Sequence, residues 1–244
     1  MLPFRAPMMT KRFAAAGGVL IPYVGGKTNP VIASNTLAET IDLTSGFSGG
    51  IDTAPSEDDL VLLFFSIFST SDRNVSVTSS GWTEIADLYG NDARDSNLGI
   101  YYKFMGATPD TSVTLGTIAN ENFSAVAALQ VWRGVDQTTP LDVAIATAVG
   151  GNTGRPDPPS ITPVTAGSVV SVVGAAAGDS FAALTSSDLD NFIQLISVGG
   201  VALAIVAAGS MPWSGGAVDP ALFGGGTEAV NASWTAASIA LRPA

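Results

Sequence analysis

The chain has 244 residues, no Cys, no His and a formal net charge of −11. Without Cys it has no disulfides, thiolate nucleophiles or iron–sulfur clusters, and it lacks the ligands of the usual structural zinc sites. Without His it cannot build a Ser-His-Asp or Cys-His catalytic group or a histidine-bearing metal site. Hydrophobic residues make up 46% and charged residues 13%, a composition that favours folding or assembly over disorder.

Residues 1–30 differ in charge from the rest of the chain. Their charged residues are all basic, namely Arg5, Lys11, Arg12 and Lys27. Four prolines and two glycine pairs in this segment disfavour a long helix or a regular strand. We therefore expect an extended basic anchoring arm at 1–30, followed by a body at 31–244. A secretory signal, with its basic pair before FAAAGGVLI, and a disordered tail are the alternatives.

After residue 30 the pattern is that of β-strands. IYYKF at 100–104 alternates its two faces, and so do Val75 and Val77 within NVSVTSSGW at 74–82. Other runs are apolar on both faces, short and bounded by turn residues, as expected for buried strands. These runs are 60–68, 124–132, 168–177, 201–208 and 237–243.

Turn clusters separate the expected strands, and Gly199-Gly200 is a candidate two-residue hairpin. Many short strands divided by such turns predict an all-β fold, an antiparallel β-sandwich of jelly-roll-like type. A faint echo relates residues 57–72 to residues 165–179, at a spacing of about 109 residues. It indicates either two sheets or lobes of related design, or only a shared composition.

An uncharged stretch at 196–213 is long enough for a transmembrane helix. Glycine, serine and proline interrupt it, and basic anchors are missing from its flanks, so we expect no membrane span. The glycine-rich loop that follows contains Trp213 and Phe223. These aromatics either pack under the loop or form part of a binding or assembly surface.

Candidate catalytic patterns are weak. GFSGG at 46–50 fits the G-x-S-x-G pattern with Ser48 as nucleophile, but the chain has no histidine to activate it, and a turn explains the glycines better. The acidic loop at 87–97 has the oxygen ligands that calcium prefers, without the spacing of a known calcium loop. A carboxylate pair of glycosidase type is a further alternative, whose required separation the sequence cannot test. We therefore expect no metal, no cofactor and no enzymatic activity.

The most distinctive stretches are DDLVLLFFSIFS, GWTEIADLYGNDARDSNLGIYYKFM, PDTSV, AVAALQVWRGVDQTTPLDV and RPDPPSITPVTAGSVVSVVGAAAG. In this order they resemble uncharacterised structural proteins of tailed bacteriophages and prophages, over residues 58–178. The resemblance implies a virion component with a β-sandwich domain, of the tail, fibre or spike type, and it brings no catalytic residues. The arm and the loop at 209–226 lie outside it.

The leading hypothesis is a non-enzymatic virion protein of a tail tip, fibre, spike or head decoration, assembled in the host cytoplasm. It would contact other virion proteins and form a homo-oligomer, most simply a trimer. The acidic body repels phosphate, so nucleic acid is not an expected partner. Charge and apolar contacts would come from the arm. The anchoring candidates are Phe4, Arg5, Met8, Met9, Lys11, Arg12 and Phe13.

The alternative is a carbohydrate-binding module that recognises a host-surface glycan. Sugar sites on sandwiches combine aromatic platforms with acids and amides. The candidate ligand surface is Tyr89, Asn91, Asp92, Tyr101 and Trp213.

Overall fold

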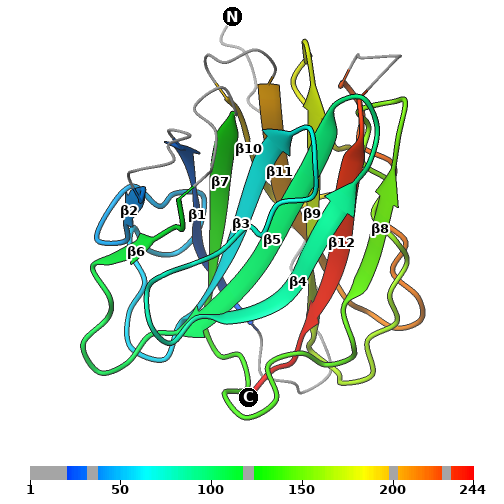
Figure 1. The fold of residues 1–244 in the computed structure, drawn as a ribbon. Helices are drawn as coiled ribbons and strands as arrows, with labels where there is room; N and C mark the ends of the chain where they lie inside the picture. Colours follow the sequence, from blue (N-terminus) through cyan, green and yellow to red (C-terminus); the bar gives the residue numbers. More distant parts are fainter. Residues whose placement is uncertain (1–20, 32–37, 118–123, 198–202, 227–231) are drawn as a thin grey trace, which may run out of the picture.

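The computed structural model describes residues 21–31, 38–117, 124–197, 203–226 and 232–244, and its regular elements are all β-strands (Figure 1). One five-stranded sheet contains, in spatial order, β1 (Tyr23–Val31), β7 (Ala125–Trp132), β3 (Leu60–Ser69), β5 (Asp95–Phe104) and β4 (Thr83–Gly90). A second contains β10 (Asp190–Ile196), β11 (Leu203–Pro212), β9 (Val169–Gly178), β12 (Trp234–Leu241) and β8 (Ala146–Gly150). A small third sheet pairs β2 (Thr40–Asp42) with β6 (Ser112–Thr114).

All strand pairs within the sheets are antiparallel, and the two large sheets pack face to face. The predicted antiparallel β-sandwich is therefore confirmed. The predicted runs 60–68, 124–132 and 168–177 correspond to β3, β7 and β9, whose residues are nearly all buried. No helix in the described part of the chain is long and apolar enough to cross a membrane.

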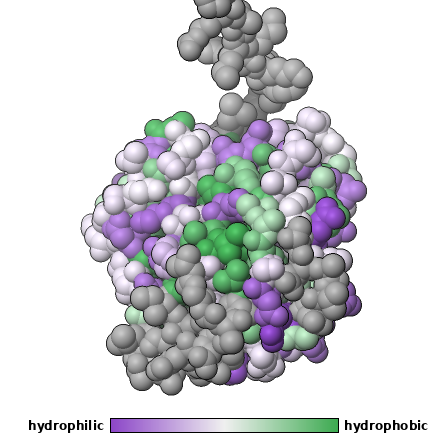
Figure 2. Space-filling view, turned by 90° about the horizontal axis from the view of Figure 1, so that it is seen from above, coloured by the Kyte–Doolittle hydropathy of each residue, from purple (hydrophilic) through white to green (hydrophobic). Residues whose placement is uncertain are grey.

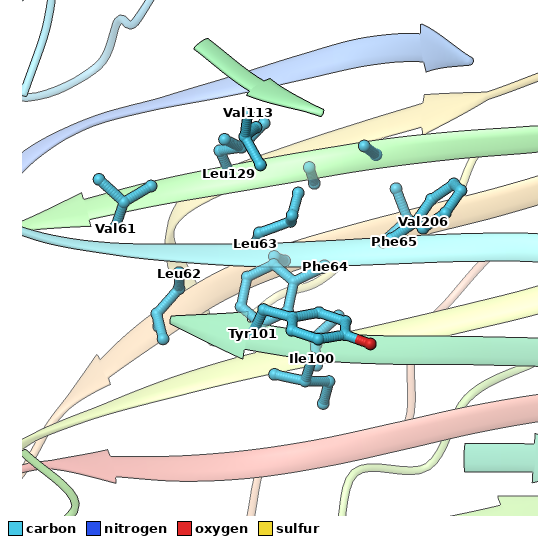
Figure 3. Close-up of a cluster of buried hydrophobic side chains, with 14 of the residues drawn as sticks. Val61, Leu62, Leu63, Phe64, Phe65, Ile100, Tyr101, Val113, Leu129 and Val206 are labelled. Carbon is cyan, nitrogen blue, oxygen red and sulfur yellow. The ribbon is translucent and has the colours of Figure 1, made fainter. Parts of the chain in front are cut away.

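The inner faces of the two sheets differ in side-chain size. The first sheet contributes large residues such as Leu62, Phe64 and Ile100, while β9 and β11 contribute Ala175 and Ala208. Because successive residues of a strand point to opposite faces, Val61 and Leu63 lie on the other side of β3, toward Val113 of β6 (Figure 3).

The outer faces are covered in different ways. On the first sheet, β2, β6 and the adjoining loops bury Ile41, Phe47 and Val75 against β3 and β5. On the second sheet, long loops add Ile161, Leu184 and Phe223 to a separate apolar cluster. Both sheets are therefore covered on both faces, which explains why their central strands are apolar on both faces.

The two large sheets have the same strand order. β1, β7, β3, β5 and β4 correspond in turn to β8, β12, β9, β11 and β10. Leu60 pairs with Trp132 in the first sheet as Val169 pairs with Leu241 in the second, each residue about 109 positions after its counterpart. The cross-sheet neighbours also correspond, because β1 lies against β10 as β8 lies against β4. The faint echo in the sequence is therefore a structural repeat with an approximate two-fold axis between β3 and β9.

Irregular features repeat at the same places. The register shifts in β4 between Glu84 and Ala86, and in β10 between Asp190 and Ile193. The turn before β3 contains Asp58 at φ 66°, and the turn before β9 contains Gly167 at φ 90°. Bulges and left-handed turns depend on local packing, so their repetition shows that the two halves share detailed backbone geometry.

Backbone hydrogen bonds outside the strands repeat as well. Phe68 N donates to Ser124 O at 2.8 Å, and the equivalent bond joins Ala177 N to Ser233 O at 3.1 Å. At the opposite end of the sandwich, Arg133 N donates to Pro22 O and Arg242 N donates to Pro140 O. The repeat therefore reaches both ends of the sheets.

Two sequence predictions need correction. Residues 23–30, assigned to the arm, belong to the edge strand β1, because an edge tolerates Pro30 near the strand end and Gly26 packs closely on Ile193. Residues 74–82 form no strand; Val77 makes one isolated bridge to Leu115, and the segment covers the outer face of β5. The proposed hairpin at 199–200 lies outside the described residues.

Figure 2 shows the end of the sandwich at which β3 and β9 finish. Apolar residues gather in the middle of this view, with hydrophilic residues around them. A bidentate pair, Arg94 with Asp179, joins the two halves near the same end, with distances of 2.6 and 3.1 Å. The halves are thus linked at this end by an ion pair in addition to the apolar packing between the sheets.

Polar side chains also bridge the two sheets inside the core. Gln130 Nε2 donates to Gly209 O at 3.2 Å, and Ser171 Oγ donates to Gln130 Oε1 at 2.7 Å. Ser66 Oγ donates to Ile205 O at 3.4 Å. Gln130, Ser66 and Ser171 are fully buried, so these bonds satisfy groups that water cannot reach.

We expect Gln130→Leu to lower the free energy of unfolding by about 1–3 kcal/mol, because it leaves the Ser171 hydroxyl and the Gly209 carbonyl without this partner. Adding Ser171→Ala should recover part of the loss, since the orphaned hydroxyl is then removed. Urea denaturation followed by tryptophan fluorescence measures both. Strictly additive costs in the double variant would contradict the coupling.

Candidate functional site

The predicted anchoring residues Phe4, Arg5, Met8, Met9, Lys11, Arg12 and Phe13 lie outside the described residues. The structure does describe where the chain enters the body. Arg133 N donates to Pro22 O at 3.1 Å, and the Tyr23 ring lies 4.9 Å from the ring of Trp132. The start of β1 is therefore fixed to the end of β7.

The predicted ligand residues do not form one surface. Tyr89, Asn91 and Asp92 belong to the β4–β5 hairpin, at the end where β3 finishes. Trp213 follows β11 at the opposite end, is half-buried, and donates from Nε1 to Gly216 O at 2.8 Å. Phe223 of the same loop is buried against the second sheet, so the loop aromatics serve mainly to pack it.

Tyr101 must be removed from the predicted ligand surface. Its side chain is only 4% exposed, and its hydroxyl lies 2.5 Å from Val75 O and 2.6 Å from Glu84 Oε2. Burial and the Glu84 carboxylate raise the pKa of this phenol, which stays protonated as a donor. The sequence analysis placed Tyr101 on a ligand surface, but the segment at 74–82 covers this face of β5.

Carboxylates of the acidic loops accept hydrogen bonds from other groups of the protein. Asp95 is buried and accepts hydrogen bonds from Tyr89 Oη and Asp92 N, while Asp188 accepts from Ala221 N. In the described part of the chain, no group of three acidic residues is arranged to hold a metal ion. Ser48 of GFSGG pairs through its backbone with Gly26 and lies in a turn.

A bidentate ion pair with a buried carboxylate closes the end of the first sheet. Arg133 Nε and Nη2 donate to the two carboxylate oxygens of Asp59 at 2.8 and 2.9 Å. The Asp59 side chain is fully buried and that of Arg133 is 39% exposed. This hydrogen bond raises the pKa of Arg133.

The second sheet has a weaker counterpart of this pair. Arg242 Nε lies 3.8 Å from Asp142 Oδ1, too far for a hydrogen bond. Burial opposes ionisation of Asp142, but hydrogen bonds from Thr165 and Val164 outweigh it and lower the pKa of this carboxyl. Asp142 is therefore stabilised by hydrogen bonds from Thr165 and Val164 and has none from its arginine. Asp59 accepts hydrogen bonds both from Arg133 and from Ser56 N.

One carboxyl on the surface of β4 is shifted in the opposite direction. Partial burial and repulsion from Glu84 and Asp72 raise the pKa of Asp87 to about 6. Nearby, burial and the hydrogen bond to Asp95 raise the pKa of Tyr89 to about 12. This edge of the first sheet is thus an acidic surface whose charge changes just below neutral pH.

A hollow of about 300 Å³ lies where β8 meets β12, on the loop-covered face of the second sheet. Its lining includes Trp234, Arg155, Asp157 and Leu222. The sequence analysis missed these residues because Trp234 sits in an ordinary strand pattern, and its partner Gly150 is distant in the chain. Asp92, one of the predicted ligand residues, adjoins this region by accepting a hydrogen bond from Asn152 N at 2.8 Å.

A second hollow lies near the C-terminus. It is lined by Asp58, residues 134–137 and Ala244, none of which is aromatic. Among the described surfaces, the Trp234 hollow is therefore the better candidate for recognition of a small molecule, because it combines an aromatic ring with charged side chains.

We expect Arg133→Met to lower the free energy of unfolding by about 2–3 kcal/mol, because it leaves the buried Asp59 carboxylate without two charged hydrogen bonds. Arg242→Met is the matched control and should cost less than Arg133→Met, because Arg242 makes no hydrogen bond to Asp142. Chemical denaturation at pH 7 measures both. Equal losses would contradict the assignment of distinct roles.

Asp87→Asn should stabilise the protein above pH 6, by less than about 1 kcal/mol because the side chain is exposed. The folded-state pKa of Asp87 lies above its ordinary value, so the wild type loses stability as pH rises through about 6. The advantage of the variant should vanish below pH 4, where the carboxyl is protonated in both states.

Denaturation midpoints between pH 4 and pH 8 test this dependence. Asp136→Asn is the control of opposite sign, because backbone hydrogen bonds from Thr139 and Thr138 lower the pKa of Asp136. That variant should lose stability at neutral pH and match the wild type in acid. An effect of Asp87→Asn that does not change with pH would contradict the shift.

No family model matches the chain, and no curated protein or solved structure matches it either. The resemblance of residues 58–178 to phage structural proteins therefore stays a prediction from the sequence. What the protein does has to be inferred from the geometry of its described residues.

Proposed function

We propose that the protein is a non-enzymatic structural component of a tailed-phage virion, in a tail tip, fibre, spike or head decoration. The single observation that carries the proposal is that the two sheets share one strand arrangement and that buried carboxylates fix the loops that connect the strands. Asp59, Asp95 and Asp142 each hold an ion pair or turn and are buried. Such a body is suited to bearing load and presenting surfaces.

The entry of the chain into the body supports attachment through the N-terminal arm. β1 pairs along its length with β7, which in turn pairs with the central strand β3. The contact of Tyr23 with Trp132 and the bond to Pro22 O fix the first residues of β1. A force applied through residues 1–20 would therefore be passed from β1 through β7 to the central strand β3.

The proposal includes assembly with other virion proteins and with further copies of this chain, most simply as a trimer. Basic residues of the arm would meet acidic partner surfaces, while its phenylalanines and methionines would supply apolar contacts. The net charge of the remaining chain, −11 less the +4 of residues 1–30, is −15. The acidic body of a neighbouring copy is therefore a suitable partner for the arm.

Quantitative mass spectrometry of purified particles tests the proposal. We expect a fixed copy number relative to the major capsid protein. A tail position predicts a small multiple of three or six copies per particle, and head decoration predicts a copy number comparable to that of the capsid protein. A chain that is expressed in the infected host but absent from particles would overturn it.

The arm is tested in the full-length chain by the triple variant Arg5→Glu, Lys11→Glu and Arg12→Glu. We expect loss of incorporation with an unchanged urea midpoint, because these residues precede the folded strands. The double variant Phe4→Ala and Phe13→Ala tests, in the same assay, how much the apolar side chains of the arm contribute to incorporation. Normal copy number in both variants would contradict anchoring through this segment.

A further inference from the structure

The Trp234 hollow is built around a specific pairing of two strands. Trp234 of β12 lies opposite Gly150 of the edge strand β8. A Cβ atom at position 150 would lie 2.5 Å from Cε2 and Cζ2 of the indole ring, closer than any real contact. The ring therefore lies across the edge strand only because residue 150 is glycine.

The other half of the molecule shows that the fold does not need this arrangement. The counterparts of Trp234 and Gly150 are Ala125 and Val31, which also face one another across two strands. Both counterparts are buried, with Ala125 1% and Val31 8% exposed. The same backbone thus carries a small buried residue in one half and a partly exposed indole in the other, where the ring lines an open hollow.

Charged groups beside the ring are available for a ligand. Arg155 Nε donates to Phe223 O at 3.2 Å, which orients the guanidinium, and no acidic side chain of the described residues pairs with it. Asp157 is exposed and makes no hydrogen bond or ion pair within the described part of the chain. One donor group and one acceptor group therefore line the hollow together.

The loop that carries these groups is fixed on several sides. Gly154 N donates to Ala232 O at 3.1 Å, and Phe223 N donates to Pro156 O at 3.1 Å. Asn152 N donates to Asp92 Oδ2 at 2.8 Å, which ties the loop to the β4–β5 hairpin. A site whose backbone is already ordered loses little conformational entropy when a ligand binds.

We propose that the Trp234 hollow binds a carbohydrate. A pyranose ring has one apolar face that can stack on the indole, and hydroxyl groups that both donate and accept hydrogen bonds. Arg155 would donate to the sugar hydroxyls and Asp157 would accept from them. A strongly anionic ligand is disfavoured by the Asp157 carboxylate and the net charge of −11.

The size and shape of the hollow agree with a sugar residue at the end or side of a glycan. Its volume of about 300 Å³ is at the lower end of the range of small-molecule sites, roughly 300–1,000 Å³. Leu222, 44% exposed, extends the apolar lining beyond Trp234. This inference goes beyond the proposed structural role and does not depend on it.

The test uses the full-length chain on a printed array of mono- and oligosaccharides, followed by titration of each positive sugar in solution with tryptophan fluorescence. We expect at least one neutral sugar to bind. Trp234→Ala should weaken its binding by about tenfold or more, equivalent to about 1.4 kcal/mol of stacking. Asp157→Asn should also weaken it, because the amide is a poorer acceptor.

Trp213→Ala is the matched control, because Trp213 packs on the same sheet at the opposite end of the strands and should leave binding unchanged. Trp234→Phe keeps an aromatic face and should retain part of the affinity, which guards against a folding defect in the alanine variant. No sugar bound above background, or affinity that survives Trp234→Ala, would overturn the inference. The copy number of Trp234→Ala in particles should equal that of the wild type, so the two proposals can fail separately.

Discussion

The packing of two sheets with the same strand order around an axis between β3 and β9 is the constraint on which the rest of the structure depends. Two identical large-residue faces would leave no room between the sheets, and two small-residue faces would leave voids. The chain resolves this by asymmetry: Leu62 and Phe64 come from one half, and Ala175 and Ala208 from the other. The backbone repeats while side-chain size is complementary, so the repeat is much clearer in the strand pairings than in the sequence.

Each half is free to differ where the shared packing does not reach. On the outer face of the first sheet, the β2–β6 sheet and the segment at 74–82 bury Tyr101. At the equivalent position of the second sheet, Gly209 packs against Leu189 from a loop. The Trp234 hollow lies in the half whose sheet is covered by long loops. The ion pairs also differ between the halves, because Arg133 donates two hydrogen bonds to Asp59 whereas Arg242 makes none to Asp142.

The sequence was sufficient to predict the buried strands and the sandwich, because apolar runs such as 60–68 and 168–177 are local signals. It was insufficient for features that depend on contacts between distant residues. The alternation of IYYKF predicted the two faces of the strand. It could not predict that the segment at 74–82 covers one of them, so Tyr101 was wrongly assigned to the ligand surface. Pro30 and the pair Gly25-Gly26 argued against a strand, yet an edge position accommodates them in β1. The position of the Trp234 ring depends on Gly150, which lies about 84 residues earlier in the chain.

The repeat also relates the two surfaces to which we assign partners. β1, which continues from the arm, and β8, which borders the Trp234 hollow, are equivalent edge strands of the two sheets. Because the sheets face each other with β1 against β10 and β4 against β8, these equivalent edges lie on opposite sides of the sandwich. A body held through the β1 side therefore leaves the β8 side free. Attachment at one edge and recognition at the other can then occur at the same time, with the hydrogen-bonded core between them transmitting load.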